Sequence, residues 1–195
     1  NKNELIIKLN NQTMTIQELA LQGKHNMFNS MAAAMAARVF EVKDSVIRQS
    51  MIDFQNVEHR LEHVLTVHGI DFINDSKATN VNACWFALES MQKNVVLIVG
   101  GVDKGNNYSE LDDMITDKVK AIICLGENNQ NIIKSFQGKV DSIVQASSMS
   151  EAVNQSFSLA AKGEAVLLSP ACASFDLFAN YEERGLQFKK AVRTL

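Results

Sequence analysis

Three polar segments combine lysines, hydroxyl groups and small residues in a pattern suited to binding an anion. They are residues 74–80 (NDSKATN), 100–105 (GGVDKG) and 169–176 (SPACASFD). Each follows a short apolar run that predicts a β-strand. Small residues let a ligand approach the backbone, and Lys77, Lys104, Thr79 and Ser174 offer donors for carboxylate or phosphate oxygens. Together the three segments predict a site for an anionic small molecule.

Each segment alone is weak evidence, because small residues at strand ends and solvated lysines are both common. The sequence contains neither the GxGxxG spacing of dinucleotide-binding turns nor a GxxxxGK[ST] phosphate loop. His63 and His68 have no partner at metal-ligand spacing, so we predict structural roles for them and no metal site. Cys84, Cys124 and Cys172 are widely spaced among apolar neighbours and are predicted to be buried, reduced thiols.

Alternating strands and helices must position these segments. Apolar runs predict strands over residues 64–67, 70–73, 95–99, 121–125, 142–144 and 166–168, and helices are predicted near 79–91, 109–116, 129–136 and 148–161 and from about 186. This alternation predicts the α/β class, with a doubly wound, mostly parallel, Rossmann-like sheet and flanking helices. Ligands of such sheets collect where the strands end at their carboxyl edge.

Helix starts are signalled by capping residues. Thr79 or Asn80 can cap the helix that follows the first polar segment. Ser109 with Asp112, and Ser148 with Glu151, have the spacing of a capping box.

The first fifty residues have a different organisation. Strands are predicted over residues 5–9 and 13–16 and a helix over 26–40, in which Phe28, Met31, Met35 and Val39 form a stripe expected to pack. Two strands and a helix of this size make a poor core by themselves, so we predict that this part docks on the residues that follow or on sequence missing from the chain. From Phe54 the pattern changes to the alternation of strands and helices.

Two further polar clusters admit two interpretations each. The first long helix is predicted to begin with His25, Asn26 and Asn29. These residues either cap the helix or contact a ligand. The charge run of residues 58–62 is either a solvated surface or a hinge that touches an anion.

Composition narrows the function classes. The 195 residues carry 19 Lys and Arg against 22 Asp and Glu, a net charge of −3, which disfavours nucleic acid as a partner. Apolar runs such as residues 95–99 are far shorter than the ~20 residues that span a bilayer, so no membrane segment is predicted. The reduced cysteines favour an intracellular location, and the start at Asn1 suggests a trimmed fragment.

Three further motifs lie at residues 23–29 (GKHNMFN), 58–62 (EHRLE) and 167–188 (LLSPACASFDLFANYEERGLQF). Together with NDSKATN and GGVDKG, they resemble the motifs of the Mur ligase family, in the same order and over nearly the whole chain. NDSKATN and SPACASFD are the most specific. Sibling ligases tend to carry Asp-Tyr-x-His where this sequence has Asp75, Ser76, Lys77 and Ala78, so the resemblance is to members that add D-glutamate.

The resemblance implies a cytoplasmic, monomeric, three-domain enzyme of peptidoglycan synthesis that uses ATP and Mg²⁺. It would join D-glutamate to UDP-N-acetylmuramoyl-L-alanine through an acyl phosphate. Residues 1–53 would end the central ATPase domain, and 54–195 would form the C-terminal amino-acid-binding domain. The family's phosphate loop, magnesium ligands, carbamylated lysine and UDP-binding domain have no counterpart in this sequence, so we expect the chain alone to be inactive and to bind no cofactor.

The resemblance also implies roles for individual residues. Lys77 would act catalytically, near the reacting phosphate and the incoming amino acid. The other implied contacts are Lys104, Thr79, Ser174, the Phe175 backbone and Tyr181 for D-glutamate, and Asn26, Asn29, Arg60 and Asp75 for ATP. At the positions of Phe175 and Tyr181, family members vary among apolar and aromatic residues.

Two alternatives stay open. The chain could belong to another Mur or folylpolyglutamate-type ligase that uses a different amino acid, although the Lys77 segment disfavours this. It could also be a stand-alone Rossmann-like module that binds a nucleotide or a partner, although the missing GxGxxG spacing disfavours a dinucleotide.

Overall fold

The computed structural model describes residues 5–9, 12–16, 24–54 and 57–195. The chain divides into two compact units, Asn1–Val57 and Glu58–Leu195, each described by itself below. The division falls a few residues after the boundary expected at residue 53. The assignment of the first unit to an ATPase domain stays a prediction.

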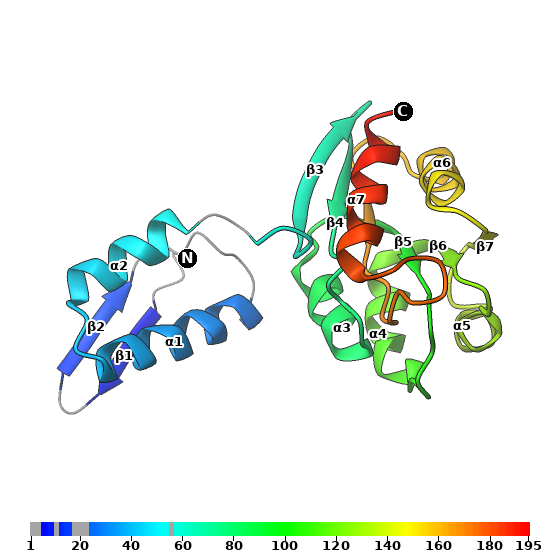
Figure 1. Ribbon diagram of the computed structural model, residues 1–195. Coiled ribbons are helices and arrows are strands. Elements are labelled where there is room, and N and C mark those ends of the chain that lie inside the picture. The colour runs from blue at the N-terminus through cyan, green and yellow to red at the C-terminus, as the bar shows by residue number, and fades with distance from the viewer. Residues whose placement is uncertain (1–4, 10–11, 17–23, 55–56) are drawn as a thin grey trace. The chain divides into compact units, whose positions relative to one another are not determined.

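The first unit pairs a hairpin with two helices (Figure 1). Strands β1 (Leu5–Leu9) and β2 (Gln12–Ile16) are antiparallel, and helices α1 (Lys24–Val39) and α2 (Asp44–Asp53) follow. The sequence analysis did not predict α2. The first unit has a small apolar cluster to which both helices contribute, made of Met27, Met31, Ala34, Ala37, Ile47 and Met51.

The expected packing of the α1 stripe is wrong for three of its four residues. Phe28, Met35 and Val39 are 61%, 42% and 71% exposed. The helix packs through Met27, Met31, Ala34 and Ala37, which lie three or four residues apart on a neighbouring stripe. The larger apolar side chains misled the prediction because small alanines form part of the buried face.

The second unit is built on a six-stranded sheet with the order β3-β4-β8-β5-β6-β7. Strand β3 runs antiparallel to β4, and the other neighbouring pairs are parallel. The strands are β3 (Glu62–Val67), β4 (Ile70–Asn74), β5 (Val95–Val99), β6 (Val119–Leu125), β7 (Ser142–Ala146) and β8 (Ala165–Leu168). The predicted α/β class with a mostly parallel sheet is therefore confirmed.

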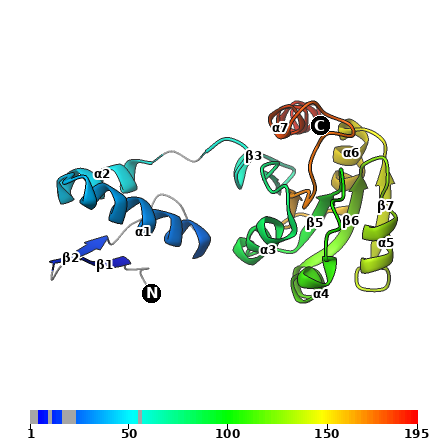
Figure 2. The same ribbon diagram turned by 60° about the horizontal axis from the view of Figure 1, so that its bottom comes forward.

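Helices cover both faces of this sheet (Figures 1 and 2). One face packs against α3 (Val81–Ser90), the short 3-10 helix η1 (Tyr108–Leu111), α4 (Asp112–Lys118) and α5 (Gln130–Phe136). The other packs against α6 (Met149–Leu159) and α7 (Tyr181–Val192). The central strand β5 is buried on both faces, which explains its unbroken apolar sequence.

The position of β8 determines where the polar segments meet. The chain runs outward through β5, β6 and β7 and then returns, so that β8 lies between β4 and β5. Because such crossovers are right-handed, the returning helix α6 covers the opposite face from α3, α4 and α5. The loops that follow β4, β8 and β5 are therefore neighbours at a point where the strand order reverses, a common ligand position.

Two predicted caps form and one does not. The Asn80 side chain accepts a hydrogen bond from Ala83 N, and Ser148 Oγ accepts one from Glu151 N. Ser109 instead lies inside η1 and donates to Asn107 Oδ1, so its capping box is wrong. The short helix η1 occupies the position at which α4 was predicted to begin.

Helix α7 begins five residues before the predicted position. Asn180 caps it by accepting a hydrogen bond from Glu183 N at 2.7 Å. The first turn is mostly polar, so the apolar spacing of Phe188, Val192 and Leu195 located only the second half of the helix. No helix in the described part of the chain has the length and apolar character needed to cross a membrane.

Candidate functional site

Three loops meet at the carboxyl edge of the sheet. We name them the Lys77 loop (residues 75–80, after β4), the Lys104 loop (100–107, after β5) and the Ser174 loop (169–180, after β8). Asp75 N donates to Leu168 O at 2.8 Å, and Ser169 Oγ donates to the Asp75 carboxylate at 3.0 Å. Gly100 N donates to Pro170 O at 3.0 Å. Main-chain hydrogen bonds therefore attach the other two loops to the end of β8 and the Ser174 loop.

The Lys77 side chain lies against Tyr181 at the start of α7. Its ammonium Nζ donates to the Tyr181 hydroxyl at 2.9 Å and lies 4.3 Å from the centre of the ring. Both Lys77 and Thr79 are half-buried, and Thr79 N donates to Lys77 O at 2.9 Å. The predicted catalytic lysine is thus already oriented by a second predicted site residue.

Hydrogen bonds hold the Lys104 loop in place on both sides of its exposed lysine. Asp103 Oδ1 accepts hydrogen bonds from Gly105 N and Asn106 N, at 2.9 and 2.8 Å. Val102 N donates to Ala173 O at 2.8 Å, and Asn106 Nδ2 donates to Ala171 O at 3.1 Å. Lys104 is therefore carried on a loop fixed to the segment just before Ser174.

Glycine is required where these two loops touch. Gly101 has φ +131°, and a Cβ built on it would lie 2.2 Å from Ala173 O. The small residues of GGVDKG therefore serve backbone packing as well as ligand access. This was the alternative interpretation of these residues.

Ser174 and Phe175 differ in exposure. Ser174 is buried, and its carbonyl accepts a hydrogen bond from Phe178 N at 3.0 Å. The adjacent Phe175 side chain is 69% exposed. The Phe175 ring therefore packs little against the described residues, and the role of its backbone in binding stays a prediction.

Asp75 is a buried carboxyl group at the base of the site. Burial raises its pKa to about 7, against the opposing influence of hydrogen bonds from Ser169 and Leu61 N and of the Arg60 charge. Arg60 is half-buried and acts on Asp75 through its charge. These two predicted ATP contacts are therefore electrostatically coupled.

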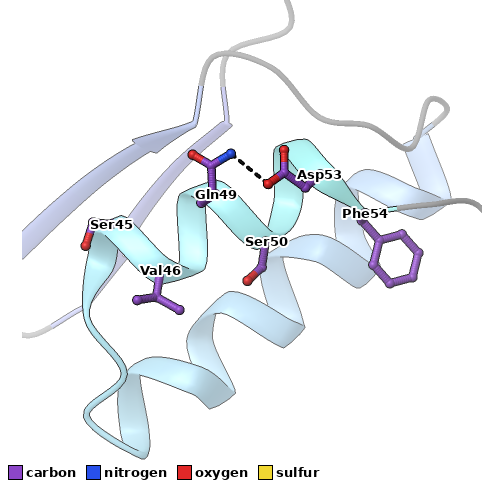
Figure 3. A pocket seen from close by; sticks show the side chains of 6 residues that line it. All are labelled: Ser45, Val46, Gln49, Ser50, Asp53 and Phe54. Carbon is purple, nitrogen blue, oxygen red and sulfur yellow. Dashed lines mark hydrogen bonds between the residues drawn. The ribbon is translucent and has the colours of Figure 1, made fainter.

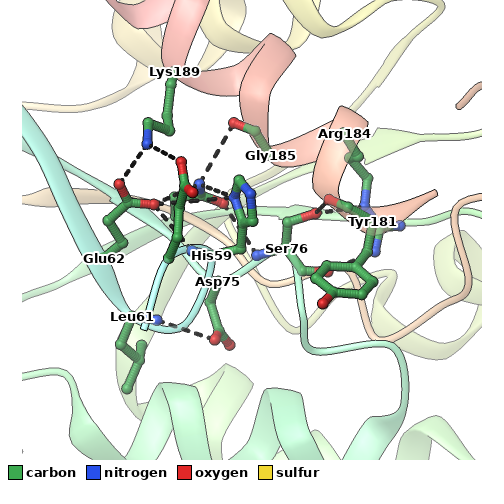
Figure 4. Close-up of polar contacts among 11 residues, drawn as sticks. His59, Leu61, Glu62, Asp75, Ser76, Tyr181, Arg184, Gly185 and Lys189 are labelled. Atoms are coloured by element: carbon green, nitrogen blue, oxygen red, sulfur yellow. Dashed lines mark hydrogen bonds and ion pairs between the residues drawn. The ribbon is translucent and has the colours of Figure 1, made fainter. Parts of the chain in front are cut away.

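Arg184 is a buried residue for which the sequence analysis predicted no role. Its Nε donates to Ser76 Oγ at 3.0 Å and its Nη2 to Ser76 O at 2.8 Å, while Nη1 donates to Cys172 O at 3.1 Å. Burial lowers its pKa to about 10. Arg184 thus joins α7 to both the Lys77 and the Ser174 loops. Figure 4 shows Arg184 beside Ser76 of the Lys77 loop. A polar run such as YEERG gives no sign that its arginine is buried, because the partners are distant in the sequence.

The charge run of residues 58–62 forms a hydrogen-bonded network in which His59 is buried and Glu58 stays exposed. Lys189 Nζ donates to Glu58 and Glu62 at 2.6 and 2.7 Å, and Asn74 Nδ2 donates to His59 Nδ1 at 2.9 Å. A Cβ on Gly185 would lie 2.2 Å from His59 Nδ1, so only glycine fits there (Figure 4).

Glu58, His59 and Glu62 form the one group of possible metal ligands found among the residues that the structure describes. Lys189 already binds both carboxylates, and Asn74 occupies the available nitrogen of the imidazole. A metal ion would compete with an ammonium charge, so these residues do not fit a Mg²⁺ site.

Asn26 and Asn29 lie near the start of α1 in the first unit, Asn26 buried and Asn29 exposed. Asn29 lines a mostly apolar cavity of about 340 Å³ between α1 and α2. A second hollow on α2 is lined by Ser45, Val46, Gln49, Ser50, Asp53 and Phe54 (Figure 3). The proposed contact of Asn26 and Asn29 with ATP stays a prediction.

The second unit is a doubly wound α/β domain in which three polar loops meet where the strand order reverses. The family model for the Mur ligase, glutamate ligase domain matches residues 59–172. The chain therefore belongs to the Mur ligase family.

Curated relatives and solved structures agree with this assignment. The UDP-N-acetylmuramoylalanine–D-glutamate ligase of Christiangramia forsetii is 56% identical over 98% of this chain and 43% of its own length. A pseudomurein peptide ligase type C from Methanothermus fervidus shares the fold, with a TM-score of 0.70 and 17% identity over 100% of this chain and 40% of that one. A MurF ligase from Thermotoga maritima, solved with ADP, gives a TM-score of 0.63 and 12% identity over 97% of this chain and 46% of that one. The chain spans less than half the length of these relatives.

Proposed function

We propose that this chain is the amino-acid-binding part of an ATP-dependent ligase that adds D-glutamate to UDP-N-acetylmuramoyl-L-alanine in the cytoplasm. The observation that carries the proposal is the meeting of the Lys77, Lys104 and Ser174 loops at one sheet edge. The name and the 56% identity of the Christiangramia forsetii relative support D-glutamate as the amino acid.

D-Glutamate brings two carboxylates and one amine to the site. Lys104, Thr79, Ser174 and the Phe175 backbone would bind the carboxylates, each charge-assisted hydrogen bond contributing about 1.5–3 kcal/mol. Tyr181, at the start of α7, would close the pocket beside Lys77. These donors orient the amine for attack on the activated alanyl carboxylate.

The acyl phosphate and the tetrahedral intermediate that follows both carry negative charge. Lys77 would stabilise that charge, because its ammonium is held beside the pocket. Arg60 and Asp75 would contact ATP from this unit, and Asn26 and Asn29 would do so from the first unit. Mg²⁺ would neutralise phosphate charge in the intact enzyme, held by residues outside this chain.

Substituting Lys104 tests the proposal in the full-length ligase. Lys104→Ala should raise KM for D-glutamate about 10- to 100-fold and leave KM for ATP within about twofold, because the proposed partner is a carboxylate of the amino acid. Lys190→Ala, which removes another exposed lysine, is the matched control.

Steady-state kinetics with D-glutamate, L-lysine and diaminopimelate complete this test. An equal rise in KM for ATP and D-glutamate would contradict the role of Lys104. A preference of the wild-type enzyme for L-lysine or diaminopimelate would assign the chain to another ligase of the family.

A further inference from the structure

We propose that the Tyr181 hydroxyl is a positioning group that holds the Lys77 ammonium in its working orientation before substrate arrives. The hydroxyl accepts a hydrogen bond from Lys77 Nζ at 2.9 Å, and the ammonium lies 4.3 Å from the ring centre. A phenylalanine at this position would still present a ring, but it would lack the hydroxyl that accepts the hydrogen bond and holds the ammonium in place.

The Tyr181 ring is itself fixed. Ser76 Oγ donates to Tyr181 O at 2.7 Å, and the ring packs edge-on against His59 with centroids 6.2 Å apart. Asn180 caps the helix directly before it. Because its main chain is held and its ring packs against a buried histidine, Tyr181 can determine the position of the more flexible lysine.

The backbone of Lys77 is held by the same group of residues. Lys77 N donates to His59 O at 3.1 Å, and both the hydroxyl and the carbonyl of the preceding Ser76 accept hydrogen bonds from Arg184. The two ends of the Lys77–Tyr181 contact therefore share one rigid support. The remaining freedom lies in the lysine side chain, which the hydroxyl restrains.

A carboxylate completes the arrangement. Tyr181 and the nearby Lys77 charge both lower the pKa of the Glu182 carboxyl group. A lysine ammonium has three protons, so two remain for substrate oxygens while one binds Tyr181.

Tyrosine differs from phenylalanine here by the hydroxyl alone, which gives a direct test on this chain by NMR. The Lys77 ε-protons, identified by their loss in Lys77→Met, should be shielded by the ring in the wild type. In Tyr181→Phe that shielding should fall by half or more, because the ammonium is released although the ring is kept. Tyr181→Leu, which lacks the ring, gives the unshielded reference.

Retention of the wild-type shielding in Tyr181→Phe would overturn the proposal, as would its absence in the wild type. Unchanged main-chain spectra outside residues 75–80 and 181–184 confirm that the variant is folded. This measurement is independent of any ligase activity.

The kinetic consequence rests on the proposed function and is measured in the full-length ligase. Tyr181→Phe should lower kcat about fivefold and change KM for D-glutamate less than about twofold, because it disturbs the orientation of Lys77 rather than the carboxylate contacts. In the Lys77→Met background the same substitution should cause no further loss.

An equal further loss in that background would show that Tyr181 acts without Lys77 and would contradict the proposal, as would an unchanged kcat in Tyr181→Phe. A wild-type enzyme with no D-glutamate ligation would instead refute the proposed function, and the NMR result would still decide the role of the hydroxyl.

Discussion

Asp75 is a carboxyl group buried beneath the residues proposed to bind substrate. Only 5% of it is exposed, and its pKa is raised to about 7. The sequence pattern placed Asp75, Lys77, Lys104 and Ser174 in polar loops after strands. It did not identify Arg184, whose hydrogen-bond partner Ser76 is 108 residues away. At the residue scale, polar residues in a local segment after a strand can be predicted from the sequence, whereas partners that meet only through the fold cannot.

The raised pKa of Asp75 predicts a pH dependence of stability. In the unfolded chain this carboxyl group titrates near its ordinary value of about 3.9. Between pH 4 and 7 the folded state therefore keeps a proton that the unfolded state has lost, so the free energy of unfolding falls as the pH rises. The effect of this one group should be about 1 to 4 kcal/mol across that range.

Urea unfolding of Asp75→Asn between pH 4 and 7.5 measures this effect. Relative to the wild type, the variant should gain stability as the pH rises, because it has no buried carboxyl group to ionise. Asp113→Asn, which alters an exposed carboxylate on α4, is the control and should follow the wild-type slope. The same slope in Asp75→Asn and in the wild type would contradict the account of Asp75.

At the element scale, apolar strands were easier to predict than helix ends. Strands β5 and β8 are buried along their whole length and so read as unbroken apolar runs. The start of α7 was missed because its cap and first turn are polar. The order of the strands was not predictable either, since periodicity does not show that β8 inserts between β4 and β5.

Arg184 connects α7 to two loops, and its loss should loosen all three elements. Arg184→Met leaves the carbonyls of Ser76 and Cys172 without these hydrogen-bond donors and should destabilise the second unit by about 3 to 5 kcal/mol. Arg184→Lys should recover less than half of this, because one ammonium cannot reproduce the planar fork.

Denaturant unfolding of these variants, compared with Arg193→Met at the exposed end of α7, measures the contribution of Arg184. The control should change stability by less than about 0.5 kcal/mol. If Arg184→Met were no less stable than the control, the joining role of Arg184 would be wrong.

At the scale of the whole molecule, the sheet topology gathers residues that are far apart in the chain. Lys77, Lys104 and Ser174 are spread over nearly a hundred residues, yet their loops share one edge through Asp75, Val102 and Asn106. The alternation of strands and helices predicted this edge. The chain covers 43% of the length of its Christiangramia forsetii relative.

The most direct measurement is the structure of the full-length ligase with D-glutamate bound. We expect one substrate carboxylate within about 3 Å of Lys104 Nζ and the other within about 3 Å of the Ser174 or Thr79 hydroxyl. D-Glutamate bound away from all three loops would contradict the central claim.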